Sequence, residues 1–206
     1  MGMGDEILVV KRDVLFKESD FQGFNPIDEK NYLDIILENY NYLIRTHGLE
    51  NDSSIKQPIP YVWILNPSEK KIFLYKRSKT GNEGRLRDKF SGGVGGHIDK
   101  KTEENSDNPI LDAMIRELKE EVFIKEYPIP KIVGFVNDDS DTVGEVHFGI
   151  VALAETDHEV KPIEDMTHGK FYSINEIEEI FSSSNNEVES WTRISWPFIK
   201  DYLSKL

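Results

Sequence analysis

Residues Arg116–Glu121, which read RELKEE, decide how the rest of the chain is interpreted. They close a run of apolar residues at helical spacing, a pattern that predicts a helix. At about 3.6 residues per turn, Glu117, Glu120 and Glu121 fall within about 100° of one helix face. Three carboxylates so close repel one another unless a cation lies among them. The pattern therefore indicates a site for Mg²⁺ or Mn²⁺, although a solvated acidic surface would carry the same residues.

A glycine-rich stretch precedes this helix, since Gly92–Ile98 reads GGVGGHI. Glycine lets the backbone approach a metal or a phosphate closely, but a tight turn or a bulge uses it for the same reason. The stretch matches neither the dinucleotide-binding nor the P-loop glycine pattern. Between the two motifs, Asn108 and Pro109 predict the start of the helix as an N-cap and a first-turn proline. A glycine loop followed by an acidic helix indicates a metal and phosphate site more strongly than either motif alone.

The composition excludes several other kinds of site. The chain has 206 residues and no cysteine, which excludes disulfides, thiolate zinc sites, iron–sulfur clusters and a catalytic thiol. No apolar run approaches the roughly 20 residues of a membrane span, so we expect a cytoplasmic protein without a membrane partner. The formal net charge of −13 argues against nucleic acid polymers as partners. A small phosphate-bearing substrate remains compatible with this charge if metal ions intervene.

Strands and helices are interspersed along the chain, which favours a single mixed α/β domain over residues 1–206. Residues 1–57 form a strand-and-helix addition, the N-terminal elaboration, on a core at 58–206. The predicted strands are Asp5–Phe16, Tyr61–Leu65, Lys71–Arg77, Lys131–Val136 and Val146–Ala154. The predicted helices are Asp28–Thr46, one from Asn108, one from Ser173, and Trp191–Leu203, the last with a bend or break at Pro197.

With these residues in place, the chain resembles the Nudix (MutT-like) hydrolases, whose signature is G-x5-E-x7-R-E-U-x-E-E-x-G-U, with U a bulky aliphatic residue. Gly96 would open this box, Arg116–Glu121 matches its centre, and Ile124 matches its last position, so the box spans 96–124. The chain departs from the signature by a six-residue insertion, an early glutamate out of register, and Phe123 in place of the late glycine. The segments Gly84–Leu86, Gly93–Ile98, Asn137–Asp139 and Val143–Gly149 resemble a bacterial and archaeal Nudix subgroup described as predicted phosphoesterases.

The resemblance implies a Nudix fold, in which a mixed sheet lies between helices, and a metal-dependent activity. That activity is hydrolysis of a diphosphate linkage in a nucleoside diphosphate joined to a group X. Glu117, Glu120 and Glu121 would bind the metal, together with the carbonyl of Gly95. Arg116 would orient the glutamates, so Arg116, Glu117 and Glu120 are the predicted catalytic residues. Further candidates for the general base are Glu145, Glu155 and Glu164.

A basic segment, Lys76–Lys89, supplies charge of the opposite sign. Arg77 and Arg85 are predicted to bind the substrate phosphates, because a guanidinium makes bidentate contacts. A solvated loop is the alternative interpretation. His97, beside the glycine loop, is the third predicted substrate-binding residue. Three further acidic residues, Asp138, Asp139 and Asp141, could hold a cation or form a turn.

Two other functions are compatible with a Nudix domain. The isomerase chemistry known on this fold uses a catalytic cysteine, which the chain lacks. A non-catalytic module that binds a nucleotide as a sensor is the main alternative, and the out-of-register early glutamate favours it. The resemblance also implies a homodimer. The predicted Asp28–Thr46 helix could form its interface, but such a helix packed on its own core would have the same sequence pattern.

Overall fold

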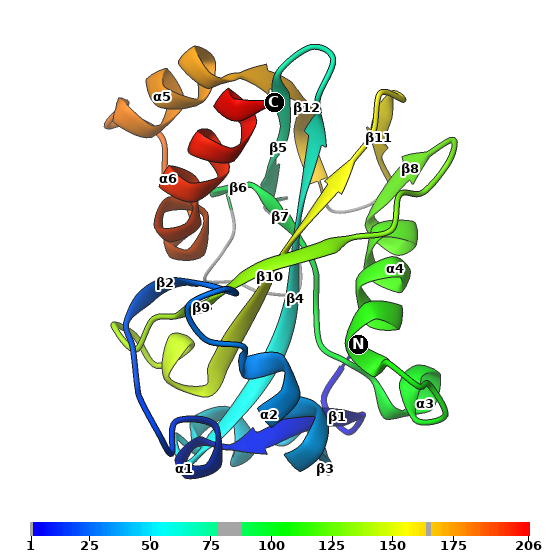
Figure 1. Cartoon of the computed structure of the whole chain (residues 1–206), viewed down its shortest axis with the longest axis vertical. Helices are drawn as coiled ribbons and strands as arrows, with labels where there is room; N and C mark the ends of the chain where they lie inside the picture. Colours follow the sequence, from blue (N-terminus) through cyan, green and yellow to red (C-terminus); the bar gives the residue numbers. More distant parts are fainter. Residues whose placement is uncertain (1, 78–87, 164–165) are drawn as a thin grey trace. The chain divides into compact units, whose positions relative to one another are not determined.

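The computed structural model describes residues 2–77, 88–163 and 166–206 (Figure 1). The chain forms two compact units, each built from three segments. The elements that contribute to both units include β4 (Ile55–Asn66), α4 (Pro109–Glu121) and β10 (His147–Glu155). Unit 1 comprises Met1–Tyr61, Gly95–Met114 and Ile132–Ala152, and unit 2 comprises Val62–Val94, Ile115–Lys131 and Leu153–Leu206.

Unit 1 is organised around antiparallel strand pairs. β1 (Glu6–Lys11) pairs with β3 (Asn41–Ile44), and its last residues pair with the start of β4. β2 (Gly23–Pro26) pairs with β9 (Lys131–Asn137), and the hydrogen-bonded order is β2-β9-β10-β4. The N-terminal elaboration therefore supplies β1, β2 and β3. The other elements of the unit are α1 (Arg12–Leu15), α2 (Tyr32–Asn39), α3 (Lys100–Glu103), the start of α4, and the 3₁₀ helices η1 (Leu49–Asn51) and η2 (Gly144–Val146).

Aromatic rings form the centre of unit 1. Phe16, Phe21 and Tyr32 come from the N-terminal elaboration, and Phe135 and Phe148 come from β9 and β10. The rings of Phe135 and Phe148 stack with centroids 5.7 Å apart, and the Tyr32 ring lies 5.4 and 5.6 Å from them. The rings of Phe16 and Phe21 lie 5.8 and 6.1 Å from that of Phe148. The N-terminal elaboration is therefore part of the core of this unit.

Unit 2 contains a hairpin followed by two C-terminal helices. The end of β4 pairs with β5 (Lys71–Arg77), and β12 (Met166–Ser173) also pairs with β5. α5 (Ile174–Ser182) and α6 (Ser190–Lys205) lie side by side, with the rings of Phe181 and Trp196 5.5 Å apart (Figure 1). The remaining strands are β6 (Phe90–Ser91) on β5, β7 (Gly93–Val94) on β4, and the pair β8 (Val122–Ile124) and β11 (Val160–Pro162).

Local sequence signals are confirmed where hydrogen bonds between near neighbours define them. The predicted hairpin is the β4–β5 pair. α4 begins at Pro109, and the side-chain oxygen of Asn108 accepts a hydrogen bond from the backbone of Leu111 at 3.1 Å. Ser173 and Glu176 make both hydrogen bonds of the capping box at the start of α5. These signals depend on a few adjacent residues, which is why the sequence alone reveals them.

The predicted helix over Asp28–Thr46 is wrong in its second half. α2 ends at Asn39, and residues 41–44 form β3 instead. Tyr42, Leu43 and Ile44 are residue types that favour strands, and pairing with β1 adds the hydrogen bonds that a helix would otherwise have supplied. A partner more than 30 positions away in the chain thus overrides the local helical spacing, as the pairing of Leu8 with Tyr42 and of Glu6 with Ile44 illustrates.

The predicted break at Pro197 is also wrong. α6 runs without interruption from Ser190 to Lys205, with the proline inside it. Proline removes one backbone hydrogen bond and costs a helix interior about 3 kcal/mol. Trp196, Ile199 and Leu203 are buried on the same helix. Burial of these side chains stabilises the helix by more than the proline destabilises it.

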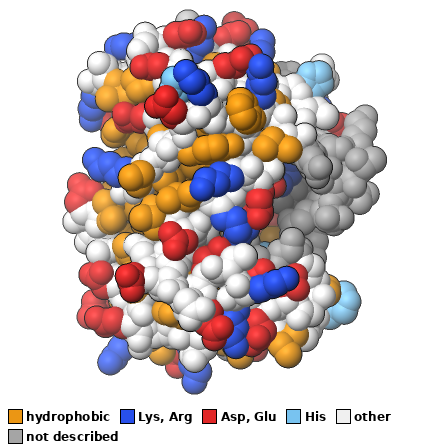
Figure 2. Space-filling view, turned by 90° about the vertical axis from the view of Figure 1, so that its right-hand side faces the viewer, with side chains coloured by type: hydrophobic (Ala, Val, Ile, Leu, Met, Phe, Trp, Pro, Cys, Tyr) orange, Lys and Arg blue, Asp and Glu red, His pale blue; other side chains and the backbone are white. Residues whose placement is uncertain are grey.

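The surface carries charges of both signs, and hydrophobic side chains gather on the face drawn in Figure 2. In unit 2, Phe123, Ile129 and Ile163 are 56%, 76% and 49% exposed. In unit 1, Leu43 and Ile44 of β3 are exposed. Within the three described ranges, no helix is long and apolar enough to cross a membrane.

The aromatic centre of unit 1 makes a stability prediction. Phe148→Ala removes a fully buried ring that contacts four other rings, so we expect the free energy of unfolding to fall by about 3 kcal/mol or more. Leu206→Ala is the control, because this leucine is exposed and should change the value by about 0.5 kcal/mol at most. Urea denaturation followed by circular dichroism measures both. Equal destabilisation by the two variants would contradict the assignment of the core.

Candidate functional site

α4 has an apolar face and a charged end. Its N-terminal turns lie in unit 1, and the segment from Ile115 onward lies in unit 2. Arg116 and Glu117 are adjacent, and Glu120 follows them by four and three residues, which places it on the next turn of the helix. The buried apolar side chains of the helix are Ile110, Ala113, Met114 and Leu118.

Arg116 forms hydrogen bonds with two of the predicted site glutamates. Its Nη1 donates to Oε1 of Glu117 at 2.6 Å and to Oε2 of Glu120 at 3.0 Å. Glu117 is 6% exposed, whereas the Glu120 side chain is 58% exposed. Burial raises the pKa of Glu117, the neighbouring Arg116 opposes that rise, and the charge of Glu120 adds to it. One guanidinium therefore balances a buried carboxylate and an exposed one.

The donor set of this cluster fits a hard divalent cation, because carboxylate oxygens are the ligands that Mg²⁺ and Mn²⁺ prefer. In the part of the chain that the structure describes, no three His, Asp or Glu side chains converge closely enough to hold a metal ion. The carboxylates of Glu117 and Glu120 converge on Arg116 instead. The side chain of Glu121 is half-buried, and its backbone carbonyl accepts a hydrogen bond from Ile163 at 2.9 Å.

The glycines of the loop are required by close packing within the protein. A Cβ atom on Gly92 would lie 2.2 Å from the Trp63 ring, and one on Gly95 would lie 1.7 Å from the carbonyl oxygen of Pro60. The carbonyl of Gly93 accepts a hydrogen bond from the hydroxyl of Tyr75 at 2.9 Å. Trp63 and Pro60 both belong to β4, so the glycines allow the loop and β7 to approach this strand closely. These contacts also fix the backbone of the loop.

His97 is buried in a polar cluster of unit 1. Its Nε2 lies 2.7 Å from Oε1 of Gln57 and 3.4 Å from Nε2 of His147. The Nδ1 of His147 lies 2.6 Å from the carbonyl oxygen of Val143. His97 and His147 are 7% and 6% exposed. A phosphate contact by His97 stays a prediction, and its observed partners are protein groups.

The described part of the basic segment pairs with acids of unit 2. Nε of Arg77 donates to Oε1 of Glu189 at 2.5 Å, and this buried glutamate also accepts from Ser91 at 2.7 Å. Lys76 lies 2.8 Å from Asp88. A substrate contact by Arg77 would therefore compete with Glu189. Arg85 lies outside the described residues.

The three additional candidates for the general base are dispersed. Glu145 is exposed at the 3₁₀ turn η2 of unit 1. Glu155, at the end of β10 in unit 2, accepts a hydrogen bond from the hydroxyl of Tyr202 at 2.7 Å. Glu164 lies outside the described residues. Their role as a base stays a prediction.

Sequence reasoning missed an ion-pair network in unit 1, the Asp139 network. Asp139 accepts from Arg12 at 2.6 and 3.1 Å, from Lys56 at 2.7 Å and from Gln22 at 2.7 Å. Lys56 is fully buried and also donates to the carbonyl oxygen of Gly144 at 2.8 Å. A charged residue at the start of a mostly apolar strand was the only sequence signal. Asp138 and Asp141 accept from nearby backbone amides, so for these two the turn interpretation is confirmed.

The network shifts the ionisation of its members. Burial lowers the pKa of Lys56, and its bond to Asp139 opposes this. Burial alone would raise the pKa of Asp139, but hydrogen bonds from Arg12, Lys56 and Gln22 lower it far below its usual range. The pKa of Arg12 rises, chiefly through its bond to Asp139. Asp139 and Arg12 are therefore charged near neutral pH, and the Asp139 carboxylate opposes the effect of burial on Lys56.

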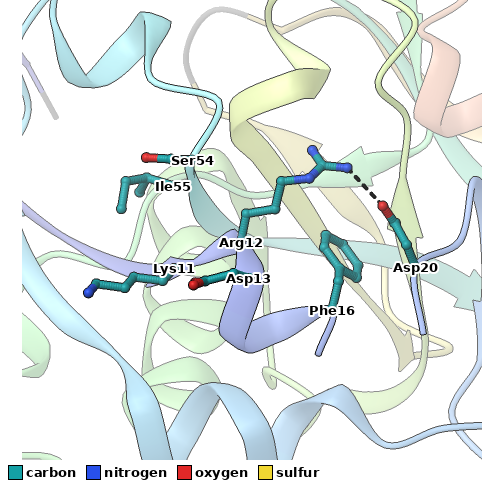
Figure 3. A pocket seen from close by; sticks show the side chains of 7 residues that line it. All are labelled: Lys11, Arg12, Asp13, Phe16, Asp20, Ser54 and Ile55. Atoms are coloured by element: carbon teal, nitrogen blue, oxygen red, sulfur yellow. Dashed lines mark hydrogen bonds and ion pairs between the residues drawn. The ribbon is translucent and has the colours of Figure 1, made fainter. Parts of the chain in front are cut away.

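A pocket of about 600 Å³ lies beside this network (Figure 3). Arg12 extends toward Asp20, with its guanidinium carbon 5.2 Å from the centre of the Phe16 ring. None of the described residues that the sequence predicts to bind metal or substrate lines it. The lining residues are Lys11, Arg12, Asp13, Phe16, Asp20, Ser54 and Ile55.

The Asp139 network makes a pH-dependent prediction. Asp139→Asn leaves the Lys56 ammonium buried without its carboxylate, so we expect the free energy of unfolding at pH 7 to fall by about 3 kcal/mol. Because the folded-state pKa of Asp139 is depressed, its contribution is complete above the ordinary aspartate pKa of about 4 and is lost as the pH falls below it. The difference between wild type and variant should therefore shrink below about pH 4.

Urea denaturation at a series of pH values measures this difference. Asp138→Asn is the matched control, because Asp138 accepts only a backbone hydrogen bond in the turn and asparagine retains the acceptor. A difference for Asp139→Asn that stays constant from pH 7 to pH 3 would contradict the predicted linkage.

Comparison with known proteins places these elements in a family. The model of the NUDIX domain family matches residues 56–192. Protein YmaB of Bacillus subtilis (strain 168) is 36% identical over 215 residues, covering 98% of this chain and all of YmaB. The crystal structure of Tm1382, a candidate Nudix hydrolase, has a TM-score of 0.78 at 23% identity and covers 96% of this chain and all of Tm1382.

A bifunctional NMN adenylyltransferase/ADP ribose pyrophosphatase from Francisella tularensis, solved with AMP and a manganese ion, has a TM-score of 0.52 at 16% identity. The alignment covers 86% of this chain and 51% of that protein. The predicted mixed α/β fold of the Nudix type is confirmed by the likeness to Tm1382. The matched family model and the identity to YmaB show that this chain belongs to the NUDIX domain family.

Proposed function

We propose that this protein is a Nudix hydrolase that cleaves a diphosphate linkage in a small nucleoside diphosphate derivative. The observation that carries the proposal is the cluster of Arg116, Glu117 and Glu120 on α4, within the segment that the NUDIX model matches. A buried glutamate and an exposed one share a single guanidinium there. An acidic helix that only faced solvent would not bury Glu117.

The residues proposed to bind Mg²⁺ or Mn²⁺ are Glu117, Glu120 and Glu121 of unit 2. The carbonyl of Gly95 is a further ligand predicted from the sequence, and its participation stays a prediction. When bound, such cations neutralise phosphate charge and lower the pKa of water. The manganese ion in the Francisella protein supports this choice of metal, and the name of that protein supports a substrate of the ADP-ribose kind.

The basic residues have two proposed roles: one orients the glutamates, and the others bind the substrate. Arg116 orients Glu117 and Glu120 through its two hydrogen bonds. Arg77, Arg85 and His97 are proposed to bind the phosphates. For Arg77 this requires an exchange of the ion pair with Glu189 for one with a phosphate.

Replacement of the site glutamates tests the proposal. Glu117→Gln and Glu120→Gln retain shape but remove a charged oxygen donor, so we expect turnover to fall by about 100-fold or more with folding intact. Product release is measured with Mg²⁺ or Mn²⁺ over ADP-ribose, NADH, dinucleoside polyphosphates, nucleoside triphosphates and coenzyme A. Glu126→Gln, a change at an exposed glutamate after the helix, is the control and should have full activity. Unchanged turnover in both site variants would sink the assignment.

A nucleotide sensor without catalysis is the second candidate. Two observations favour it: the early box glutamate is out of register, and the described residues contain no three converging metal-ligand side chains. Isothermal titration of the same substrates with Mg²⁺, performed beside the product assay, separates the two functions. Binding without product supports the sensor, and product formation supports the hydrolase.

A homodimer and a cytoplasmic location complete the proposal. The exposed Phe123, Ile129 and Ile163 of unit 2 are compatible with an interface between copies. Sedimentation velocity of the wild type and of Phe123→Ser tests the dimer, which the serine should weaken if this face forms the interface.

A further inference from the structure

The N-terminal elaboration contacts the backbone directly after the glycine loop. The amide of Leu8 in β1 donates to the carbonyl oxygen of Ile98 at 2.9 Å, and Ile7 forms an antiparallel bridge with Asp99. Lys100 lies 3.1 Å from Glu6. β1 therefore fixes one end of the segment that begins at Gly95.

The Asp139 network makes a second connection. Arg12, from the N-terminal elaboration, binds Asp139 through two nitrogen atoms. Lys56 binds the same carboxylate and donates to the carbonyl oxygens of Gly144 and His147, the latter at 3.2 Å. Lys56 can make three hydrogen bonds, and these three acceptors use all of them. The segment from Asp139 to His147 is thereby held at both ends.

His147 extends this connection to the loop. A carbonyl oxygen only accepts, so the proton of the His147 ring lies on Nδ1, where it is donated to Val143. The neutral ring then has an acceptor at Nε2, 3.4 Å from Nε2 of His97. A hydrogen on Nε2 of His97 can be shared with this acceptor and with Oε1 of Gln57. The His97 ring is thus oriented by its partners on two strands, β4 and β10.

The loop needs such support because Gly95 and Gly96 have no side chains that could anchor it. Its backbone direction must come from neighbours on either side. Pro60 packs on Gly95 from one side, and His97 and Ile98 follow on the other.

We propose that the N-terminal elaboration positions the glycine loop Gly95–His97, with Arg12, Lys56 and His147 as the positioning residues. The inference rests on the proposed function, because the loop is given a role in binding metal and phosphate there. Arg12 acts on the loop through Asp139, Lys56 and His147, and touches no substrate.

Hydrogen exchange of the apo-protein tests the positioning without any assay of activity. Arg12→Gln should raise the exchange rate of the Leu8 amide, which donates to the carbonyl oxygen of Ile98, by about tenfold. Arg45→Gln is the matched control, since Arg45 lies in the same elaboration and pairs with Glu50 at 2.8 Å. It should leave this amide unchanged. No change at Leu8 in Arg12→Gln, or an equal change in both variants, overturns the inference.

Binding of Mn²⁺ alone, measured by electron paramagnetic resonance, provides the functional test. His147→Phe retains a ring but removes Nε2, and we expect Mn²⁺ affinity to fall by about tenfold. His147→Gln restores a polar group near Nε2 and should recover most of the affinity, whereas a purely structural role would not distinguish the variants in this way. Full affinity in His147→Phe, or an equal loss in both, overturns the inference.

The two experiments separate this inference from the proposed function. If the wild type binds no Mn²⁺ and releases no product, the proposed function fails, and the exchange rate of the Leu8 amide alone decides whether the elaboration positions the loop.

Discussion

Lys56 can keep its charge inside the protein only because the carboxylate of Asp139 lies 2.7 Å from its ammonium group. A buried ammonium without a partner would lose its proton or force water into the core. The same carboxylate also binds Arg12 and Gln22, so one aspartate joins α1, the residue before β2, the start of β4 and the turn before β10. The packing of unit 1 depends on this interaction, since it ties together segments that are far apart in the chain.

Two charged clusters of the chain differ in their ratio of cations to carboxylates. Around Asp139 in unit 1, a buried lysine and a partly exposed arginine share one carboxylate. On α4, two carboxylates share the single cation of Arg116 in unit 2. The first is saturated and suits a structural role. The second has an excess of oxygen donors, which suits an exchangeable cation, and this difference supports α4 as the place of chemistry.

Local signals predicted much of the fold and the centre of the site. The Asn108 cap, the capping box at Ser173 and the RELKEE motif each depend on residues within one or two turns, so their spacing is visible in the sequence. β3 was mistaken for helix because its strand pairing is with β1, far away in the chain. The Lys56–Asp139 pair spans 83 positions, and no periodicity links the two residues. The sequence alone does not show which residues far apart in the chain will pair.

The division of each unit into three segments has a consequence for synthesis on the ribosome. Unit 1 needs Ile132–Ala152, so it stays incomplete until most of the chain has been made. Arg12 and Lys56 leave the ribosome long before Asp139, so their charged groups stay solvated until the carboxylate is present. Contacts of this long range slow folding, because loop closure precedes the gain from burial. The nascent N-terminal strands, rich in Val, Ile and Leu, are therefore exposed for most of translation, and chaperones should find their binding sites there.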